Sequence, residues 1–185
     1  MMKEIEDIFC ALWVTTTRIH ARIMLYDGSV SMDELDETDR SILAELQRDA
    51  ARPVSELADA VGLSPSPVWR RIKRLEERGV LRKTVAVLSR EALGLNLVAI
   101  AMVSLSHHSQ ESLDVFEAAL RDAPEVQQVV AVTGDRDFMV RVVVKDMEGY
   151  QRFLARRLLP LSMIRSVNTS FVLREVKDTN ALPVD

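Results

Sequence analysis

The stretch Val54–Leu81 constrains the fold of this chain most strongly, because it has the pattern of two short helices joined by a tight turn. Ser55, or Pro53 before it, can open the first helix, and Gly62 supplies the positive φ needed to leave it. The apolar residues of this helix recur with helical spacing at Leu57, Ala58 and Val61. A second helix is therefore expected directly after Gly62.

The second helix has a marked start, a buried stripe and a marked end. Ser64 or Ser66 is predicted to be its N-cap and Pro67 its first helical residue, because a proline there loses no hydrogen bond and already has a helical φ. Gly79 is predicted to stop it. The apolar stripe at i, i+4 and i+7 consists of Val68, Ile72 and Leu75. The face expected to point outward consists of Trp69, Arg70, Arg71, Lys73 and Arg74.

The outward face is cationic although the chain as a whole is acidic. Residues 64–83 hold seven basic and two acidic side chains, a local balance of +5, whereas the formal net charge of the chain is −4. The start of the helix, marked by Ser64, Ser66 and Pro67, also presents the backbone N–H groups of its non-proline residues, which can bind a phosphate. These features predict a helix-turn-helix whose second helix enters the major groove of double-stranded DNA.

A simpler interpretation of the basic run is that it forms only the solvated face of a surface helix. The coincidence of the glycine turn, the proline at the helix start and the cationic outer face at helix-turn-helix spacing favours DNA binding.

Length and composition allow two small domains and exclude several other classes of protein. The chain has 185 residues, of which 48% are hydrophobic and 28% charged. The single cysteine, Cys10, excludes a disulfide framework and an all-cysteine metal site, and it fits a reducing compartment, so a cytoplasmic protein is expected. The apolar run Ile8–Val14 is too short to span a bilayer, and acidic residues before it argue against a signal peptide. No membrane, metal or cofactor is expected.

Residues 1–31 differ in character from the rest and precede a second plausible start at Met32. They are either a non-native extension or a real amphipathic or partly disordered segment, and the sequence leaves both open. From Met32 an acidic first turn with Asp36 as N-cap predicts a first helix whose inward residues are Ile42, Leu43 and Leu46. Residues 32–81 are thus expected to form a three-helix DNA-binding domain.

Beyond Gly79 the apolar period changes from helical to alternating, which predicts a wing strand and hinge over residues 82–96. Residues 97–185 are predicted to form a second domain with the order β-α-β-β-α-β, one sheet with both helices on a single face. Its elements are expected at Leu97–Ser106, Ser109–Asp122, Val126–Thr133, Phe138–Val144, Met147–Leu158 and Ile164–Leu173. The fold class is therefore α+β, a winged helix-turn-helix followed by a ferredoxin-like domain.

A helix-turn-helix followed by such a sandwich resembles the Lrp/AsnC family of regulators from bacteria and archaea. The resemblance covers residues 32–185, and its motifs read LDETDRSIL, SPSPVWRRIKRLEERGVL, VTGDRDFMVRV and FVLREVKDTNALPV. It implies a transcriptional regulator whose second, RAM-type domain assembles the protein, as dimers and commonly octamers, and binds a small effector, usually an amino acid. A two-fold dimer would place its half-sites about 10 base pairs apart.

The loop between the third and fourth predicted segments of this domain is the expected effector site, because an amino acid needs donors for its carboxylate and acceptors for its ammonium. Backbone N–H groups near Gly134 could supply the donors, and Asp135 or Asp137 the acceptor. The candidate effector-binding residues are Thr133, Gly134, Asp135, Arg136 and Asp137. Arg136 departs from the family pattern, in which an aromatic residue is common, and leaves the effector's identity open. A tight hairpin connection is the alternative interpretation of the loop, and Ser166 and Thr169 are weaker candidates.

Two further functions stay open at this stage. One is a decarboxylase-type enzyme built on the same pair of domains, although no catalytic triad or phosphate loop stands out. The other is a module that senses an amino acid without binding DNA. His107 and His108 are adjacent, so on a strand they would point to opposite faces and could not bind one metal together.

Overall fold

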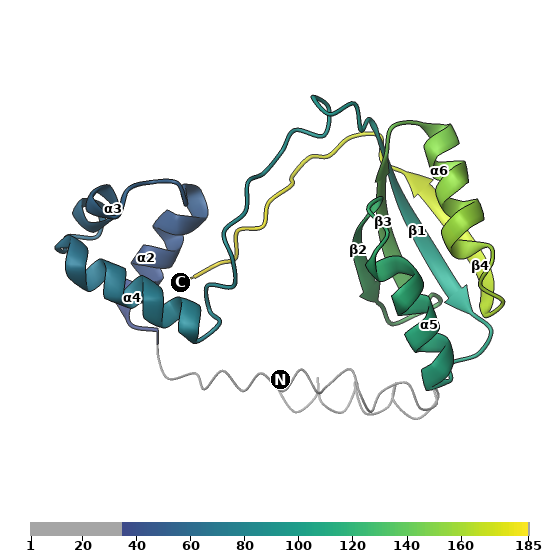
Figure 1. Ribbon diagram of the computed structural model, residues 1–185, viewed down its shortest axis with the longest axis horizontal. Helices are drawn as coiled ribbons and strands as arrows, with labels where there is room; N and C mark the ends of the chain where they lie inside the picture. Colours follow the sequence, from purple (N-terminus) through teal and green to yellow (C-terminus); the bar gives the residue numbers. More distant parts are fainter. Residues whose placement is uncertain (1–34, 185) are drawn as a thin grey trace, which may run out of the picture. The chain divides into compact units, whose positions relative to one another are not determined.

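The computed structural model describes residues 35–184, which divide into two compact units (Figure 1). The helical unit contains the chain up to Ala86 together with the C-terminal segment from Thr179, and the sheet unit spans Val87–Asp178. The sequence predicts a second domain over residues 97–185. In the structure, the last part of that range, from Thr179, belongs by its contacts to the helical unit. The expectations for residues 1–31 and Met32 lie outside the described residues.

Three helices form the helical unit. Helix α2 (Glu37–Arg48) begins as predicted after Asp36, whose carboxylate accepts the backbone N–H of Asp39 at 2.8 Å. Helix α3 (Val54–Ala60) opens after Pro53. Gly62 follows α3 with φ 68°, a backbone conformation that side chains with a Cβ rarely adopt. The predicted turn between the two helices is therefore confirmed.

The second helix of the motif, α4 (Pro65–Glu77), starts two residues earlier than predicted. Pro65, not Pro67, is its first residue, and Ser64 takes the N-cap position without a capping bond from its side chain. The first N–H groups of any helix lack an intrahelical partner, so Pro65 and Pro67 can both lie in the first turn without losing a hydrogen bond. Gly79, at φ 70°, follows the end of the helix as predicted.

The core of the helical unit closely matches the predicted apolar stripes. Its buried residues are Ile42, Leu43, Leu57, Ala58, Val68 and Leu75, with Ile72, Leu46 and Val61 partly buried against them. The C-terminal segment, residues 179–184, joins this core through Val184. It is also hydrogen-bonded to α2, because the Gln47 amide donates to the Leu182 carbonyl at 3.0 Å and accepts the Leu182 N–H at 2.6 Å.

The predicted wing strand does not form. Residues 82–88 have no strand assignment, and their side chains are exposed, including Val85 and Val87. Alternating apolar residues form a strand only when another strand satisfies their backbone groups, and none of the strands between residues 35 and 184 pairs with this segment. The prediction of a winged motif is therefore wrong for the single chain.

The sheet unit has the predicted β-α-β-β-α-β order. Its elements are β1 (Leu97–Leu105), α5 (Gln110–Arg121), β2 (Val126–Ala131), β3 (Phe138–Val144), α6 (Met147–Phe153), the π-helical turn η1 (Leu154–Leu158) and β4 (Ile164–Phe171). All neighbouring strands are antiparallel, in the order β2-β3-β1-β4. Helices α5 and α6 cover one face of this sheet (Figure 1).

Alternation along the strands separates the two faces of the sheet. The helix-covered face holds the core, in which Phe116 of α5 packs on Phe138 with their ring centroids 4.5 Å apart. The buried strand residues of this face are Ala99, Ala101, Val103 and Leu105 of β1 and Phe138, Val140, Val142 and Val144 of β3. The opposite face carries Met139, Arg141 and Val143 of β3. We call it the open face.

Candidate functional site

Four of the five side chains predicted to face outward are exposed on α4, and only Arg71 is half-buried. Trp69 is 53% exposed, and Arg70 is exposed beside it. The Lys73 ammonium also faces solvent and donates to the Glu76 carboxylate at 2.6 Å. The helix start at Ser64, Pro65 and Ser66 is exposed as well. Because Pro65 and Pro67 have no backbone N–H, Ser66 is the residue of this first turn that can offer one beside the cationic side chains.

Arg71 and Arg74 are instead turned toward α2. Arg71 Nη1 donates to Asp36 Oδ2 at 2.6 Å and to Asp39 Oδ1 at 2.8 Å, and Arg74 Nη2 donates to Asp39 Oδ2 at 2.6 Å. Asp39 is fully buried, and a buried carboxylate is stable only when cations and hydrogen bonds compensate its charge. The prediction that Arg71 faces outward is therefore wrong, whereas the Arg74 side chain remains 49% exposed.

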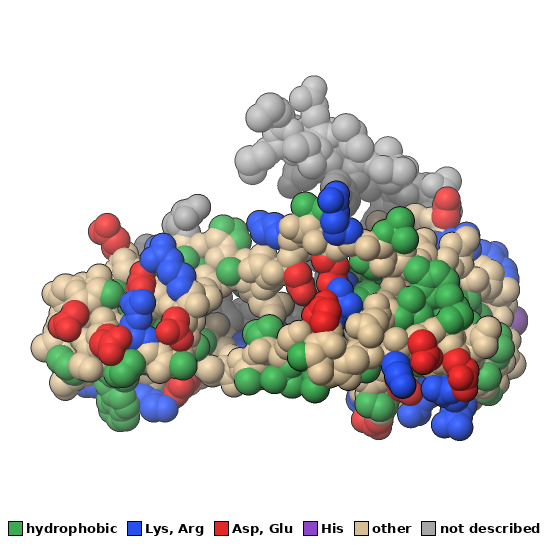
Figure 2. Space-filling model, turned by 90° about the horizontal axis from the view of Figure 1, so that it is seen from above, with side chains coloured by type: hydrophobic (Ala, Val, Ile, Leu, Met, Phe, Trp, Pro, Cys, Tyr) green, Lys and Arg blue, Asp and Glu red, His purple; other side chains and the backbone are tan. Residues whose placement is uncertain are grey.

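The same contacts shift the acid–base equilibria of the pair. The hydrogen bond from Arg71, with the N–H of Asp39, lowers the pKa of Asp36 below its usual range, and the two carboxylates raise the pKa of Arg71. Asp36 and Arg71 are therefore both charged at neutral pH. Figure 2 shows acidic and basic side chains lying next to one another on the visible face of the helical unit.

An open depression of about 300 Å³ lies along α4, lined by Pro67, Arg70, Arg71 and Arg74. Of its three guanidinium groups, those of Arg71 and Arg74 are bound to carboxylates, and Arg70 is the one without an ion pair among residues 35–184. Sequence analysis identified these four residues. It identified Asp36 as the N-cap of the first helix but missed that Asp36 and Asp39 pair with these arginines, a pairing that their i, i+3 spacing at the start of α2 could have indicated.

The loop Thr133–Asp137 joins β2 to β3 and exposes its first half. Gly134 has φ 111°, a conformation that requires glycine. Thr133, Gly134 and Asp135 are exposed, whereas Arg136 and Asp137 are half-buried. The five predicted effector residues therefore divide into an exposed part and a part that packs against the sheet.

The carboxylate of Asp137 is occupied within the domain. Its Oδ2 accepts the backbone N–H of Leu105 at 2.7 Å, and its Oδ1 lies 2.9 Å from Nε2 of His108. His107 and His108 lie in the loop after β1, not on the strand, because β1 ends at Leu105. Asp137 thus fixes the end of β1 against the loop, a role that its position beside Gly134 in the sequence does not reveal.

Arg136 extends from the same loop across the open face of the sheet. Its Nη1 donates to the Ser166 hydroxyl at 3.0 Å and to the buried Ser104 hydroxyl at 3.4 Å. Both acceptors are neutral, and no carboxylate of residues 35–184 forms an ion pair with Arg136. Ser166 therefore lies close to the loop, whereas Thr169 is hydrogen-bonded to Tyr150 beneath α6.

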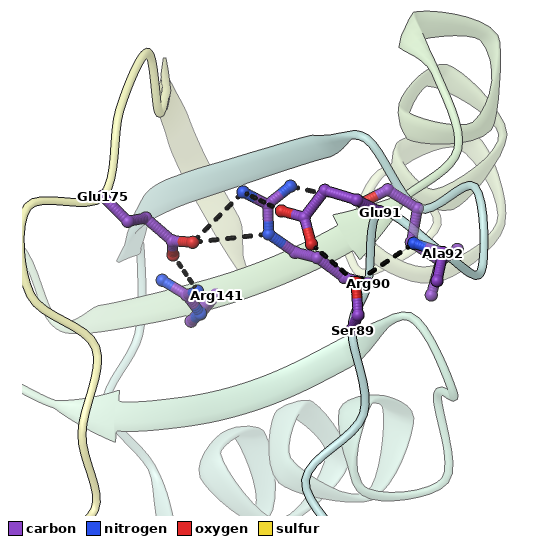
Figure 3. Close-up of polar contacts among 7 residues, drawn as sticks. Ser89, Arg90, Glu91, Ala92, Arg141 and Glu175 are labelled. Carbon is purple, nitrogen blue, oxygen red and sulfur yellow. Dashed lines mark hydrogen bonds and ion pairs between the residues drawn. The ribbon is translucent and has the colours of Figure 1, made fainter.

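A second arginine cluster ties the ends of the sheet unit together (Figure 3). Glu175 accepts from Nε and Nη2 of Arg90 at 3.3 and 3.2 Å through one oxygen and from Arg141 through the other. Arg141 also donates to Gln127 at 3.1 Å. The hydrogen bond from Arg141 lowers the pKa of Glu175. Sequence analysis missed this cluster because its partners are far apart, Arg90 and Glu175 by 85 positions.

Two classes of site find no support within the described part of the chain. No three histidine, cysteine, aspartate or glutamate side chains among residues 35–184 gather closely enough to hold a metal ion. None of the helices in that range has the length and apolar character that a bilayer span requires.

Comparison with known proteins gives matches to both units. Residues 35–76 match the AsnC-type helix-turn-helix domain, and residues 98–182 match the Lrp/AsnC ligand-binding domain. The transcriptional regulator AzlB of Bacillus subtilis is 36% identical over 82% of this chain and 96% of its own length. The DNA-binding transcriptional activator DecR of Escherichia coli is 37% identical over 82% and 99%.

The fold also matches solved structures. A transcriptional regulator from Neisseria meningitidis, crystallised as its complex with L-methionine, superimposes with a TM-score of 0.79. It is 37% identical, and the match covers 82% of this chain and 98% of that one.

Proposed function

The chain belongs to the Lrp/AsnC family of DNA-binding transcriptional regulators, and from this premise we propose which of its surfaces bind DNA and effector. It is a regulator and not an enzyme, because both of its domains and its relatives are those of regulators. We expect it to act in the cytoplasm, where bacterial DNA lies.

The DNA-reading surface in this proposal is the exposed side of α4. The main support is that Arg70 and Lys73 are exposed on α4 close to its start, where the backbone N–H of Ser66 is available to a phosphate. Arg71 and Arg74 line the depression beside it, where both are bound to carboxylates of Asp36 and Asp39. Trp69, 53% exposed, would pack against the DNA backbone or a base edge.

The effector in this proposal is a free amino acid, as the methionine complex of the Neisseria relative supports. Its carboxylate would receive backbone N–H groups near Gly134 and the guanidinium of Arg136, whose present acceptors are neutral hydroxyls. Its ammonium would pair with Asp135, because Asp137 is already occupied by Leu105 and His108. Thr133 would complete the polar lining.

Assembly with further copies of the chain completes the proposal. The open face of the sheet carries Ile100, Met102 and Met139, which are only partly buried in the single chain. An apolar sheet face without a helix layer is expected to pack against another protein surface. A dimer, and from it an octamer, would bring pairs of α4 helices to one DNA duplex.

One binding experiment tests both surfaces. The affinity of the full chain for DNA upstream of its own gene is measured by footprinting at fixed salt, with and without each common amino acid. We expect Arg70→Ala to reduce specific binding by about 1–3 kcal/mol, whereas Arg121→Ala, at a 71% exposed position on α5, leaves it unchanged.

The effector arm of the same experiment uses Asp135→Asn, with Asp122→Asn after α5 as its charge-matched control. Asp135→Asn is expected to abolish the response to the effector while DNA binding in its absence is retained. Equal responses of wild type and Asp135→Asn would refute the loop as the effector site. Equal footprints of wild type and Arg70→Ala would refute the assignment of α4.

A further inference from the structure

Arg71 and Arg74 of α4 have two competing environments. On one side they line the open depression with Pro67 and Arg70. On the other they bind Asp36 and Asp39 of α2 through three contacts of 2.6 to 2.8 Å. A DNA phosphate that enters the depression therefore meets guanidinium groups that already have carboxylate partners.

The two carboxylates differ in how tightly they hold these arginines. Asp39 is fully buried and contacts both guanidinium groups, so it belongs to the packing between α2 and α4. The Asp36 side chain is 49% exposed and, of the two arginines, contacts only Arg71. Removal of the Asp36 charge does not disturb the packing of the core, and Arg71 stays bound to Asp39. Asp36 is thus the partner whose charge can be removed with little effect on folding.

A carboxylate beside a guanidinium changes how DNA binding depends on salt. Each cation that neutralises a DNA phosphate releases counterions, and the salt slope counts these cations. An arginine whose charge is compensated within the protein contributes less to that slope. Every compensated arginine therefore weakens sequence-independent binding, while contacts to base edges are unaffected.

We propose that Asp36 and Asp39 act as internal counter-anions that hold Arg71 and Arg74 back from the DNA backbone and so limit non-specific binding. This inference rests on the proposed function of α4 as the DNA-reading helix. Asp36 is a positioning residue in this role, because it acts on DNA only through Arg71. The pair raises specificity by lowering the affinity for DNA that lacks the operator sequence.

The test measures salt dependence with Asp36→Asn in the full-length chain. Asparagine caps helices as well as aspartate does, so α2 keeps its N-cap while the charge next to Arg71 is lost. Glu37→Gln is the matched control, because it removes the same charge at the adjacent exposed position, and Glu37 has no ion pair with α4. Fluorescence anisotropy with a random-sequence duplex and an operator duplex, at several salt concentrations, gives the slopes.

We expect Asp36→Asn to steepen the salt slope by up to about one and to raise non-specific affinity several-fold at 0.1 M salt, with a smaller gain on the operator. If Asp36→Asn changes the salt slope by no more than Glu37→Gln does, the proposal is overturned. This holds whether the non-specific affinity of Asp36→Asn falls or stays constant. Arg70→Ala in the same assay tests the underlying function, because Arg70 forms no ion pair within residues 35–184 and its loss should weaken operator binding. If Arg70→Ala also has no effect, α4 is not the DNA interface.

Discussion

The charge of Glu175 should stabilise the sheet unit, because its carboxylate joins two arginines from separate parts of the chain (Figure 3). Arg90 lies in the turn before β1, and Arg141 lies on the open face of β3. Glu175→Gln keeps the size of the side chain and its capacity for neutral hydrogen bonds but removes the charge. We expect this variant to unfold more easily at neutral pH.

The exposed fractions of the three charged side chains determine how much stability Glu175→Gln should lose. Glu175 is 20% exposed, Arg90 28% and Arg141 24%, so water screens these pairs less than it screens a surface ion pair. Hydrogen bonds to charged groups contribute about 1.5–3 kcal/mol, of which glutamine retains a part. We therefore expect Glu175→Gln to lower the free energy of unfolding by about 1–2 kcal/mol. In a unit of this size each kcal/mol lowers Tm by roughly 4–8 °C.

The difference in stability between wild type and Glu175→Gln should disappear at acidic pH. The pKa of Glu175 in the folded protein is lowered by Arg141, so its stabilisation is complete above the pKa of an unfolded glutamate, about 4.3. It is lost as the pH falls through the lower, folded value. Wild type and Glu175→Gln should therefore differ at pH 7 and become alike below that folded pKa.

The assay is differential scanning calorimetry of the full chain across this pH range, at one protein concentration because oligomerisation shifts Tm. Glu91→Gln is the control, since Glu91 contacts Arg90 from a 62% exposed position and should contribute nothing measurable. Equal stability of Glu175→Gln and Glu91→Gln at pH 7, or a difference that persists into strong acid, would refute the reasoning.

The remaining predictions concern a surface contact of the helical unit and the core of the sheet unit. Gln47→Ala removes both hydrogen bonds to Leu182 and should release residues 179–184 from α2 at a cost of about 1 kcal/mol; hydrogen exchange should then quicken in the helical unit but not in the sheet unit, and unchanged protection of α2 would contradict it. Phe116→Ala empties a fully buried site against Phe138 and should destabilise the sheet unit by about 3–5 kcal/mol in urea unfolding, whereas Val115→Ala, at a 44% exposed position next to it, should have little effect; similar losses in both variants would mean that Phe116 is not a core residue.

Comparison of two alternating segments explains which elements can be predicted from sequence. Both Phe138–Val144 and residues 82–88 have alternating patterns, but only the first forms a strand, with the predicted bounds. The first pairs with β1 and β2 on its two sides, whereas the second has no partner within residues 35–184. An alternating pattern shows that a segment is suited to a strand. It does not show whether the tertiary fold supplies a neighbouring strand to pair with it.

Helix starts show a similar limit at finer scale. Ser64, Ser66 and Pro67 predict a helix start within two residues, because capping and proline preferences are local. Pro65 satisfies the same preferences, so the choice between the two prolines depends on packing. The separation of Arg71 from Arg70 also depends on packing, because it arises from Asp39 on another helix.

The arginines in both units show why a count of charges along the sequence overestimates the positive charge available to bind an anionic ligand. Residues 64–83 have a local balance of +5, but Arg71 and Arg74 are compensated by carboxylates 32 to 35 positions away. Arg141 would be an anion site by position alone, yet Glu175 already binds it. Arg136, held only by hydroxyls, is the contrasting case. A guanidinium without a carboxylate partner keeps its full attraction for an incoming anion, so binding chemistry in this protein should follow the distribution of its carboxylates as closely as that of its arginines.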